Sequence, residues 1–168
     1  MASNAQDRSA TEEQPKAKRA SGFQPSLKGR ALRLLSLREH SRQELERKLK
    51  PFEETPGELA EALDFLQAKD FINEQRVVES VVNSRSRKLG ASRVRQELQA
   101  KGLPAEAIAE AVQEMRSTEL ERAREVWRKK FGEPPADQAA RVKQVRFLVS
   151  RGFAPEVVKR VVAGADEL

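Results

Sequence analysis

Apolar positions along the chain follow a spacing that occurs three times. In each copy, two residues four positions apart are followed, after a gap of ten, by a second pair four positions apart. The three sets are Leu45, Leu49, Leu59 and Leu63, then Val94, Leu98, Ile108 and Val112, then Gln144, Leu148, Val158 and Val162. Residues at i and i+4 share one face of an α-helix, and a gap of ten leaves room for a turn and a second helix. The spacing therefore predicts three stacked helical hairpins, and elongated arrays of this kind usually bind other macromolecules along their length.

Apolar residues ahead of each hairpin predict one more helix per copy. The segments Leu27–Leu35, Val77–Val82 and Ala123–Trp127 place their apolar residues at helical spacing. The sequence thus predicts an all-α fold, an elongated array of three tandem three-helix repeats of helix-turn-helix type. The predicted repeats span residues 26–72, 73–117 and 118–168. Residues 1–25 lack apolar periodicity and are predicted to form a disordered N-terminal tail.

Capping residues and glycines mark the predicted helix ends. The expected N-caps are Ser41, with Glu44 completing a capping box, and Ser92, Ser117 and Asp137. The first helix of the second repeat is expected to span residues 73–88. Gly102 and Gly152, fifty positions apart, are expected to follow helices as C′ residues with positive φ. The helix-turn-helix shape has two interpretations: a DNA reader, or a stable way to pack short helices.

The composition favours a binding protein over an enzyme. Charged residues make up 35% and aromatic residues 5% of the 168 positions, which suits three small cores better than one large core. The net charge is +6 and the pI is about 9.8, so polyanions or acidic protein surfaces are plausible partners, although a basic pI also serves solubility alone. The chain has no Cys, and no apolar stretch approaches the length of a membrane span. A cytoplasmic protein without membrane contact is expected.

Residue types needed for catalysis are scarce. His40 is the single histidine, so no histidine dyad, triad or metal cluster is expected, and its place at a helix end favours a capping or solvated role. The sequence contains neither a P-loop nor a G-x-G-x-x-G motif. Glu44 and Lys48, like Glu46 and Lys50, are i, i+4 pairs typical of solvated helix faces. We expect no enzymatic activity, no cofactor and no metal.

Basic residues are in excess only in the second and third repeats. Residues 27–72 hold nine basic and nine acidic side chains, whereas residues 73–117 hold eight against six, and residues 118–168 hold eleven against eight. Such an excess indicates a positive stripe that tracks phosphates or an acidic groove. Solvated helix faces are the alternative interpretation. The candidate filament- or DNA-binding residues are Arg85, Arg87, Lys88, Arg93, Arg95, Lys101, Arg128, Lys129, Arg141, Lys143 and Arg146.

Three motifs, one in each repeat, resemble those of the RecX family. They are REHSRQEL at 38–45 with Lys48-Leu49; Lys88-Leu89-Gly90, Arg93, Glu97-Leu98 and Lys101-Gly102-Leu103; and Phe147-Leu148 with Arg151-Gly152-Phe153. Their order on a repeated helical array makes the resemblance specific, and it covers about residues 27–164. Two departures stand out: Asn73 replaces a common Asp, and the loop from Phe52 to Pro56 is acidic where a Lys-Gly turn is expected.

The resemblance implies a regulator of the RecA recombinase. RecX-like proteins bind along the groove of the RecA–DNA filament and restrain its ATP hydrolysis, strand exchange and co-protease activity. The implied setting is the regulation of DNA repair, homologous recombination and the SOS response, with a monomer binding the RecA filament and with single- or double-stranded DNA as a further candidate partner. The alternative is a helix-turn-helix-type DNA-binding regulator that acts without a recombinase.

Overall fold

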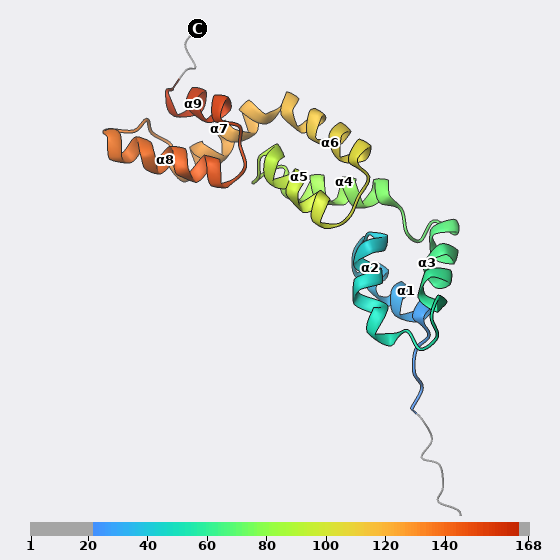
Figure 1. The fold of residues 1–168 in the computed structure, drawn as a ribbon. Coiled ribbons are helices and arrows are strands. Elements are labelled where there is room, and N and C mark those ends of the chain that lie inside the picture. Colours follow the sequence, from blue (N-terminus) through green and yellow to red (C-terminus); the bar gives the residue numbers. More distant parts are fainter. Residues whose placement is uncertain (1–21, 165–168) are drawn as a thin grey trace, which may run out of the picture.

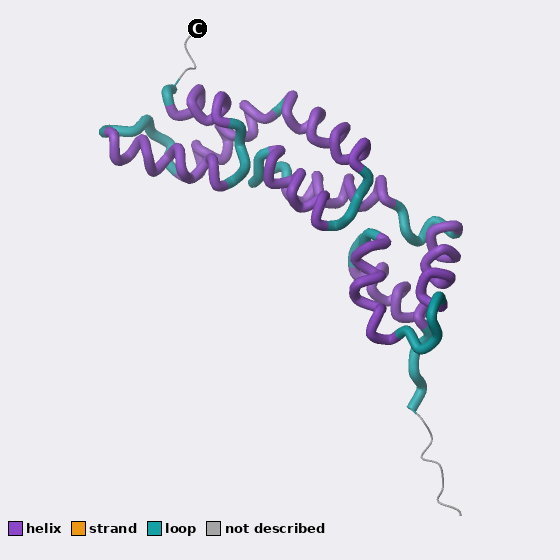
Figure 2. Tube along the Cα trace, viewed as in Figure 1, coloured by secondary structure: helices purple, strands orange, loops and turns teal. Residues whose placement is uncertain are grey.

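The protein is an elongated arc of helices in the computed structural model, which describes residues 22–164. Within that range there are nine α-helices, one short 3₁₀ turn and no strand, so the predicted all-α array is confirmed (Figures 1 and 2). The predicted tail over residues 1–25 lies almost wholly outside the described residues. None of the helices between residues 22 and 164 is both long and apolar enough to cross a membrane.

The helices form three groups of three, which we call units 1, 2 and 3. Unit 1 contains α1 (Leu27–Leu37), α2 (Arg42–Leu49), the 3₁₀ turn η1 (Lys50–Phe52) and α3 (Glu58–Ala68). Unit 2 contains α4 (Glu74–Arg85), α5 (Ala91–Ala100) and α6 (Ala105–Ser117). Unit 3 contains α7 (Glu119–Lys130), α8 (Gln138–Ser150) and α9 (Pro155–Val162). Only Thr118 separates α6 from α7, and the repeat boundaries at 72/73 and 117/118 stay predictions.

Each unit has its own apolar core. Three separate clusters of buried side chains correspond to the three units, and all twelve residues of the repeated spacing are buried. Leu49, Leu98 and Leu148 hold equivalent positions and are 2%, 0% and 0% exposed. The predicted register of the repeat is therefore confirmed. A small three-helix core buries little surface, so these central leucines carry much of each unit's stability.

Several predicted helix ends are confirmed and three are wrong. Ser41 and Glu44 form the predicted capping box, and Asp137 caps α8 through the Ala140 N–H. Ser117 does not cap α7, because it is the last residue of α6 and its hydroxyl donates to Glu114 O. Ser92 lies inside α5, whose N-cap is Gly90. The helix expected over 73–88 ends at Arg85.

The joint between units 2 and 3 is a contact between backbones. The Gly90 N–H donates to Arg151 O at 2.8 Å, and the Ser92 N–H donates to Gly152 O at 3.3 Å. Gly152 has φ +86°, and a Cβ at this position would lie 2.3 Å from Arg93 Cγ and 2.6 Å from Arg93 N. Glycine is therefore required here both by the left-handed backbone and by the close approach of α5.

The joint between units 1 and 2 uses the equivalent carbonyl oxygen fifty residues earlier, but here the donor is a side chain. The Ser41 hydroxyl at the start of α2 donates to Lys101 O at 2.6 Å. Gly102 has φ +71°, and the Gln43 side chain occupies the space that a Cβ would need. The predicted positive φ of Gly102 and Gly152 is thus confirmed, and both glycines also serve as docking points for the preceding unit. Because the joint is repeated, α2, α5 and α8 follow one another along the inner edge of the arc (Figure 1).

Candidate functional site

The candidate cations Arg93 and Arg95 belong to α5, and Arg141, Lys143 and Arg146 to α8, two of the helices that follow the inner edge of the arc (Figure 1). Arg93, Arg141, Lys143 and Arg146 are exposed and Arg95 is half-buried. Within residues 22–164 none of these five cations lies within salt-bridge distance of a carboxylate, whereas other cations of the chain do. Two successive units therefore present free positive charge from equivalent helices. This arrangement suits a ligand that carries negative charge at repeated intervals.

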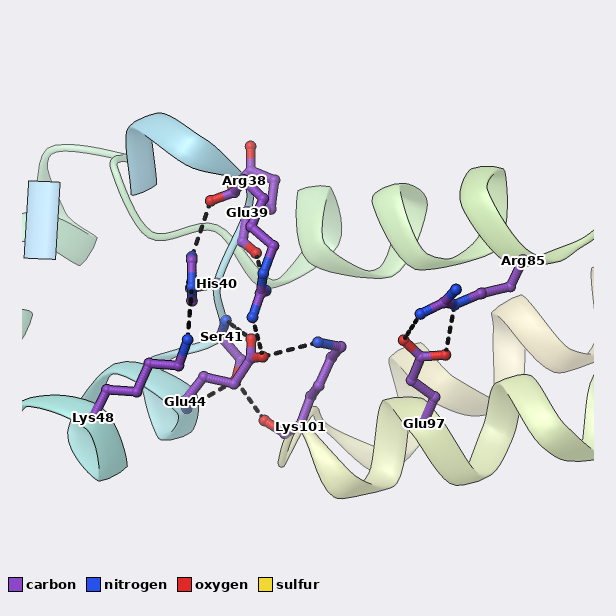
Figure 3. A network of polar contacts seen from close by, with 9 residues as sticks. All are labelled: Arg38, Glu39, His40, Ser41, Glu44, Lys48, Arg85, Glu97 and Lys101. Atoms are coloured by element: carbon purple, nitrogen blue, oxygen red, sulfur yellow. Dashed lines mark hydrogen bonds and ion pairs between the residues drawn. The ribbon is translucent and has the colours of Figure 1, made fainter. Parts of the chain in front are cut away.

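A second group of candidates gathers at the carboxyl-terminal ends of α4 and α7. Arg85 pairs with Glu97 at 3.0 Å (Figure 3), and Arg128 and Lys129 both pair with Glu125. Cations in the last turn of a helix also stabilise the helix through its dipole. These three residues therefore already have a structural role. Beyond the end of α4, Arg87 and Lys88 are exposed and hold no ion pair in the described part of the chain.

Lys101 belongs to the joint between units 1 and 2. Its ammonium group lies 2.8 Å from Glu44 Oε1, and its side chain is only 15% exposed. Arg38 reaches the same carboxylate oxygen at 3.0 Å, as Figure 3 shows. A second ion pair also spans the joint: Arg76 on α4 of unit 2 pairs with Glu39 of unit 1 at 2.9 Å. The geometry thus assigns Lys101 to holding two units together.

Glu44 was expected to lie on a solvated helix face as an i, i+4 pair with Lys48, and this prediction is wrong. It is buried and does not pair with Lys48. Burial by itself raises the pKa of Glu44, but hydrogen bonds from Lys101, Arg38 and the Ser41 N–H outweigh it and hold the pKa at about 2. Spacing alone missed this because the principal partner, Lys101, lies 57 positions away. Glu44 remains charged at every pH near neutrality and anchors the polar joint.

His40 is buried as well, so of the two roles expected for it the solvated one is wrong. Its Nδ1 lies 3.0 Å from Arg38 O, and its Nε2 lies 3.5 Å from the Lys48 ammonium (Figure 3). Burial is the main reason that the pKa of His40 is lowered from 6.5. A neutral imidazole that donates through Nδ1 and accepts through Nε2 satisfies both contacts.

Two arrangements on the third unit were missed by the sequence analysis. Arg122 donates from its guanidinium to the carbonyl oxygens of Ser86, Leu89 and Met115 at 2.7–2.8 Å, and burial lowers its pKa. It therefore ties α7 to unit 2, in a contact that no local spacing indicates. Arg151 stacks over the Phe147 ring at 4.8 Å, which fixes one more cation beside the joint with α5.

Among residues 22–164 no group of three His, Asp or Glu side chains is arranged to hold a metal ion. The site offers exposed cations on equivalent helices, with hydrogen-bonded joints between the units. Such a surface can bind an extended anionic target.

Family profiles and the similar proteins reported below all belong to one family. Profiles of the first, second and third three-helix domains of RecX match residues 28–66, 73–112 and 117–162. A "Regulatory protein RecX" from Leptothrix cholodnii is 53% identical over 143 residues, which cover 85% of this chain and 91% of that protein. The protein of the same name from Ralstonia pickettii is 48% identical over 143 residues, covering 85% and 90% of the two chains.

Solved structures agree in fold. The crystal structure of RecX from Lactobacillus salivarius has a TM-score of 0.68 and 20% sequence identity, and the match covers 83% of this chain and 94% of that chain. A second structure, described as regulatory protein RecX, also has a TM-score of 0.68, with 21% identity over 84% of this chain and 72% of the other.

Proposed function

Because the chain belongs to the RecX family, we propose that it regulates the RecA recombinase by lying along the RecA–DNA filament. In this proposal it restrains ATP hydrolysis, strand exchange and co-protease activity, and so modulates DNA repair, homologous recombination and the SOS response. It acts by occupying the filament as a monomer in the cytoplasm and catalyses no reaction of its own.

The observation that carries this proposal is the repetition of one helix position along the inner edge of the arc. α2, α5 and α8 occupy equivalent places there (Figure 1). The joints between them use acceptor carbonyls, of Lys101 and Arg151, and positive-φ glycines, Gly102 and Gly152, that recur at a separation of fifty residues. A filament presents identical subunits at regular intervals, so three equivalent helices can meet neighbouring subunits in the same way. Contacts that are weak singly become strong when they are linked, because the first raises the effective concentration of the others.

Electrostatic attraction supports the same assignment. A DNA-bearing filament is anionic, and cations that have no internal partner can meet phosphates or carboxylates without first breaking an ion pair. We expect the principal contacts to come from Arg87, Lys88, Arg93, Arg95, Arg141, Lys143 and Arg146. We expect smaller contributions from the internally paired candidates Arg85, Lys101, Arg128 and Lys129.

The alternative is a DNA-binding regulator of helix-turn-helix type that acts without a recombinase. One observation favours it. Arg87, Lys88 and Arg93 are exposed close together in sequence around the start of α5, and such a cluster needs only phosphates as a target.

Charge reversal distinguishes the two proposals. We expect Arg93→Glu with Arg95→Glu to weaken binding to the RecA filament strongly at low salt and to flatten the salt dependence by about one unit of log-log slope for each ionic interaction removed. The matched control is Lys159→Glu with Arg160→Glu on α9, at the outer edge of the arc (Figure 1), which should bind like wild type. Equal weakening on the filament and on bare duplex would favour the DNA-binding alternative, and unchanged binding to both would contradict the proposed surface.

A further inference from the structure

Unit 1 contains a cavity that differs from the basic edge of units 2 and 3. It has a volume of about 260 Å³ and lies between α1, the end of α2 and η1. Its apolar wall includes Leu34, Leu37 and Phe52, and its charged lining consists of Arg30, Arg33 and Lys48. A concave, mostly apolar site with a few convergent charges has the usual form of a ligand site.

The charge of this cavity is one-sided although unit 1 as a whole is neutral. Three cations line it and no carboxylate does. Three acidic side chains of unit 1 are engaged elsewhere: Glu44 with Lys101, Glu39 with Arg76, and Glu53 with Lys50. The cavity therefore concentrates positive charge in a unit whose nine basic and nine acidic residues cancel. An anionic occupant is the complementary one.

The apolar part of the cavity is unusually exposed. Leu37, the last residue of α1, is 78% exposed, and Phe52 is 47% exposed. One face of the Phe52 ring is covered by the Arg30 guanidinium at 3.9 Å, and Arg30 is held in place by Gln24. Two large apolar side chains at the rim of a cavity can pack against an apolar side chain of a binding partner.

The lining of the cavity favours an acidic peptide segment over a nucleic acid as its occupant. Leucine side chains are no platform for base stacking, and the single aromatic ring already carries Arg30 on one face. The chain's own residues 1–21 are a poor occupant, because they contain Glu12 and Glu13 but no large apolar residue except Met1.

We propose that this cavity binds an acidic segment of the protein partner, with a large apolar side chain between Leu37 and Phe52 and carboxylates on Arg33 and Lys48. The inference rests on the proposed function, since it assigns the segment to the RecA filament. It gives unit 1 a protein contact that is separate from the electrostatic contacts of units 2 and 3.

The test uses two variants with matched controls. Leu37→Ser removes the apolar contact and Arg33→Glu reverses a charge, and both side chains are exposed, so the melting temperature should hardly change. The control for the first is Leu32→Ser, a leucine of the same helix that is 37% exposed and does not line the cavity. The control for charge is Lys28→Glu, a cation of the same helix that is exposed and does not line the cavity.

Binding is measured to RecA filaments on single-stranded DNA and to the bare DNA. We expect each cavity variant to lose about tenfold or more in filament affinity. For Leu37→Ser this loss corresponds to the burial of one leucine side chain, and for Arg33→Glu it comes from repulsion of the acidic segment. Both controls should stay within about twofold of wild type, and binding to bare DNA should be unaffected. Cavity variants that bind the filament like wild type would overturn the inference and leave the proposed function standing.

Three other outcomes also decide the question. Equal weakening on bare DNA would show that the occupant is nucleic acid and would overturn the inference. If deletion of residues 1–21 raises filament affinity and makes it insensitive to Leu37→Ser, the occupant is the chain's own tail, which overturns it too. Failure of the wild-type protein to bind filaments would overturn the proposed function and this inference together.

Discussion

The buried leucines at equivalent positions set the stability of each unit. Leu98 is fully buried in the core of unit 2, and the same position is filled by Leu49 and Leu148 in the other units. We expect Leu98→Ala to lower the free energy of unfolding by about 2–5 kcal/mol, because it removes buried apolar surface and leaves a cavity. Urea unfolding measures the effect. A midpoint that hardly moves would contradict the assigned core.

Glu44 gives the joint between units 1 and 2 a dependence on pH. Its pKa is about 2 in the folded protein against an ordinary value of 4.5, so its contribution is complete above about pH 4.5 and is lost as the pH falls toward 2. We expect Glu44→Gln to cost about 1–3 kcal/mol at pH 7 and to flatten the fall in stability below pH 4.5. The measurement is urea unfolding at pH 7, 4.5 and 3.

The control is Glu46→Gln, which removes a half-exposed i, i+4 pair with Arg42 and should have little effect. If the wild type and Glu44→Gln lose stability in parallel as the pH falls, the buried carboxylate does not hold the joint.

At the scale of helices, local capping and spacing rules predicted much of the structure. They failed where residues distant in sequence contact each other. Caps such as Ser41 and Asp137 act within three residues, so the sequence contains all the information they need. Arg122 was missed because it binds carbonyl oxygens 33 and 36 positions away. Ser117 was misjudged as a cap because α6 and α7 are separated by a single residue, which no capping pattern indicates.

The glycine at the α8–α9 turn carries a prediction of its own. Gly152→Ala should destabilise the protein by about 1–3 kcal/mol through its left-handed backbone, and further through collision with Arg93. Gly57→Ala is the matched control, because Gly57 has φ +89° and open space around its Cα. Thermal unfolding should show a clearly larger destabilisation for Gly152→Ala. Equal effects would mean that the close approach of α5 contributes nothing.

At the scale of the whole molecule, the repeated spacing was sufficient to predict three helical units, but it did not predict how they face one another. The positive excess of units 2 and 3 is visible in the sequence, whereas the division into free and paired cations is not. Arg85 and Glu97 are twelve positions apart, and Lys101 and Glu44 are 57 apart. The basic cavity of unit 1 stayed hidden for the same reason, because the acidic side chains that cancel its charge in sequence lie elsewhere in space.

RecA-catalysed ATP hydrolysis on single-stranded DNA, measured with and without this protein, tests the central claim most directly. The account predicts that the wild-type protein slows hydrolysis as its concentration rises, and that the variant with Arg93→Glu and Arg95→Glu needs a much higher concentration to do so. Hydrolysis that stays unchanged while the wild-type protein is bound to the filament would contradict the claim that occupancy restrains the recombinase.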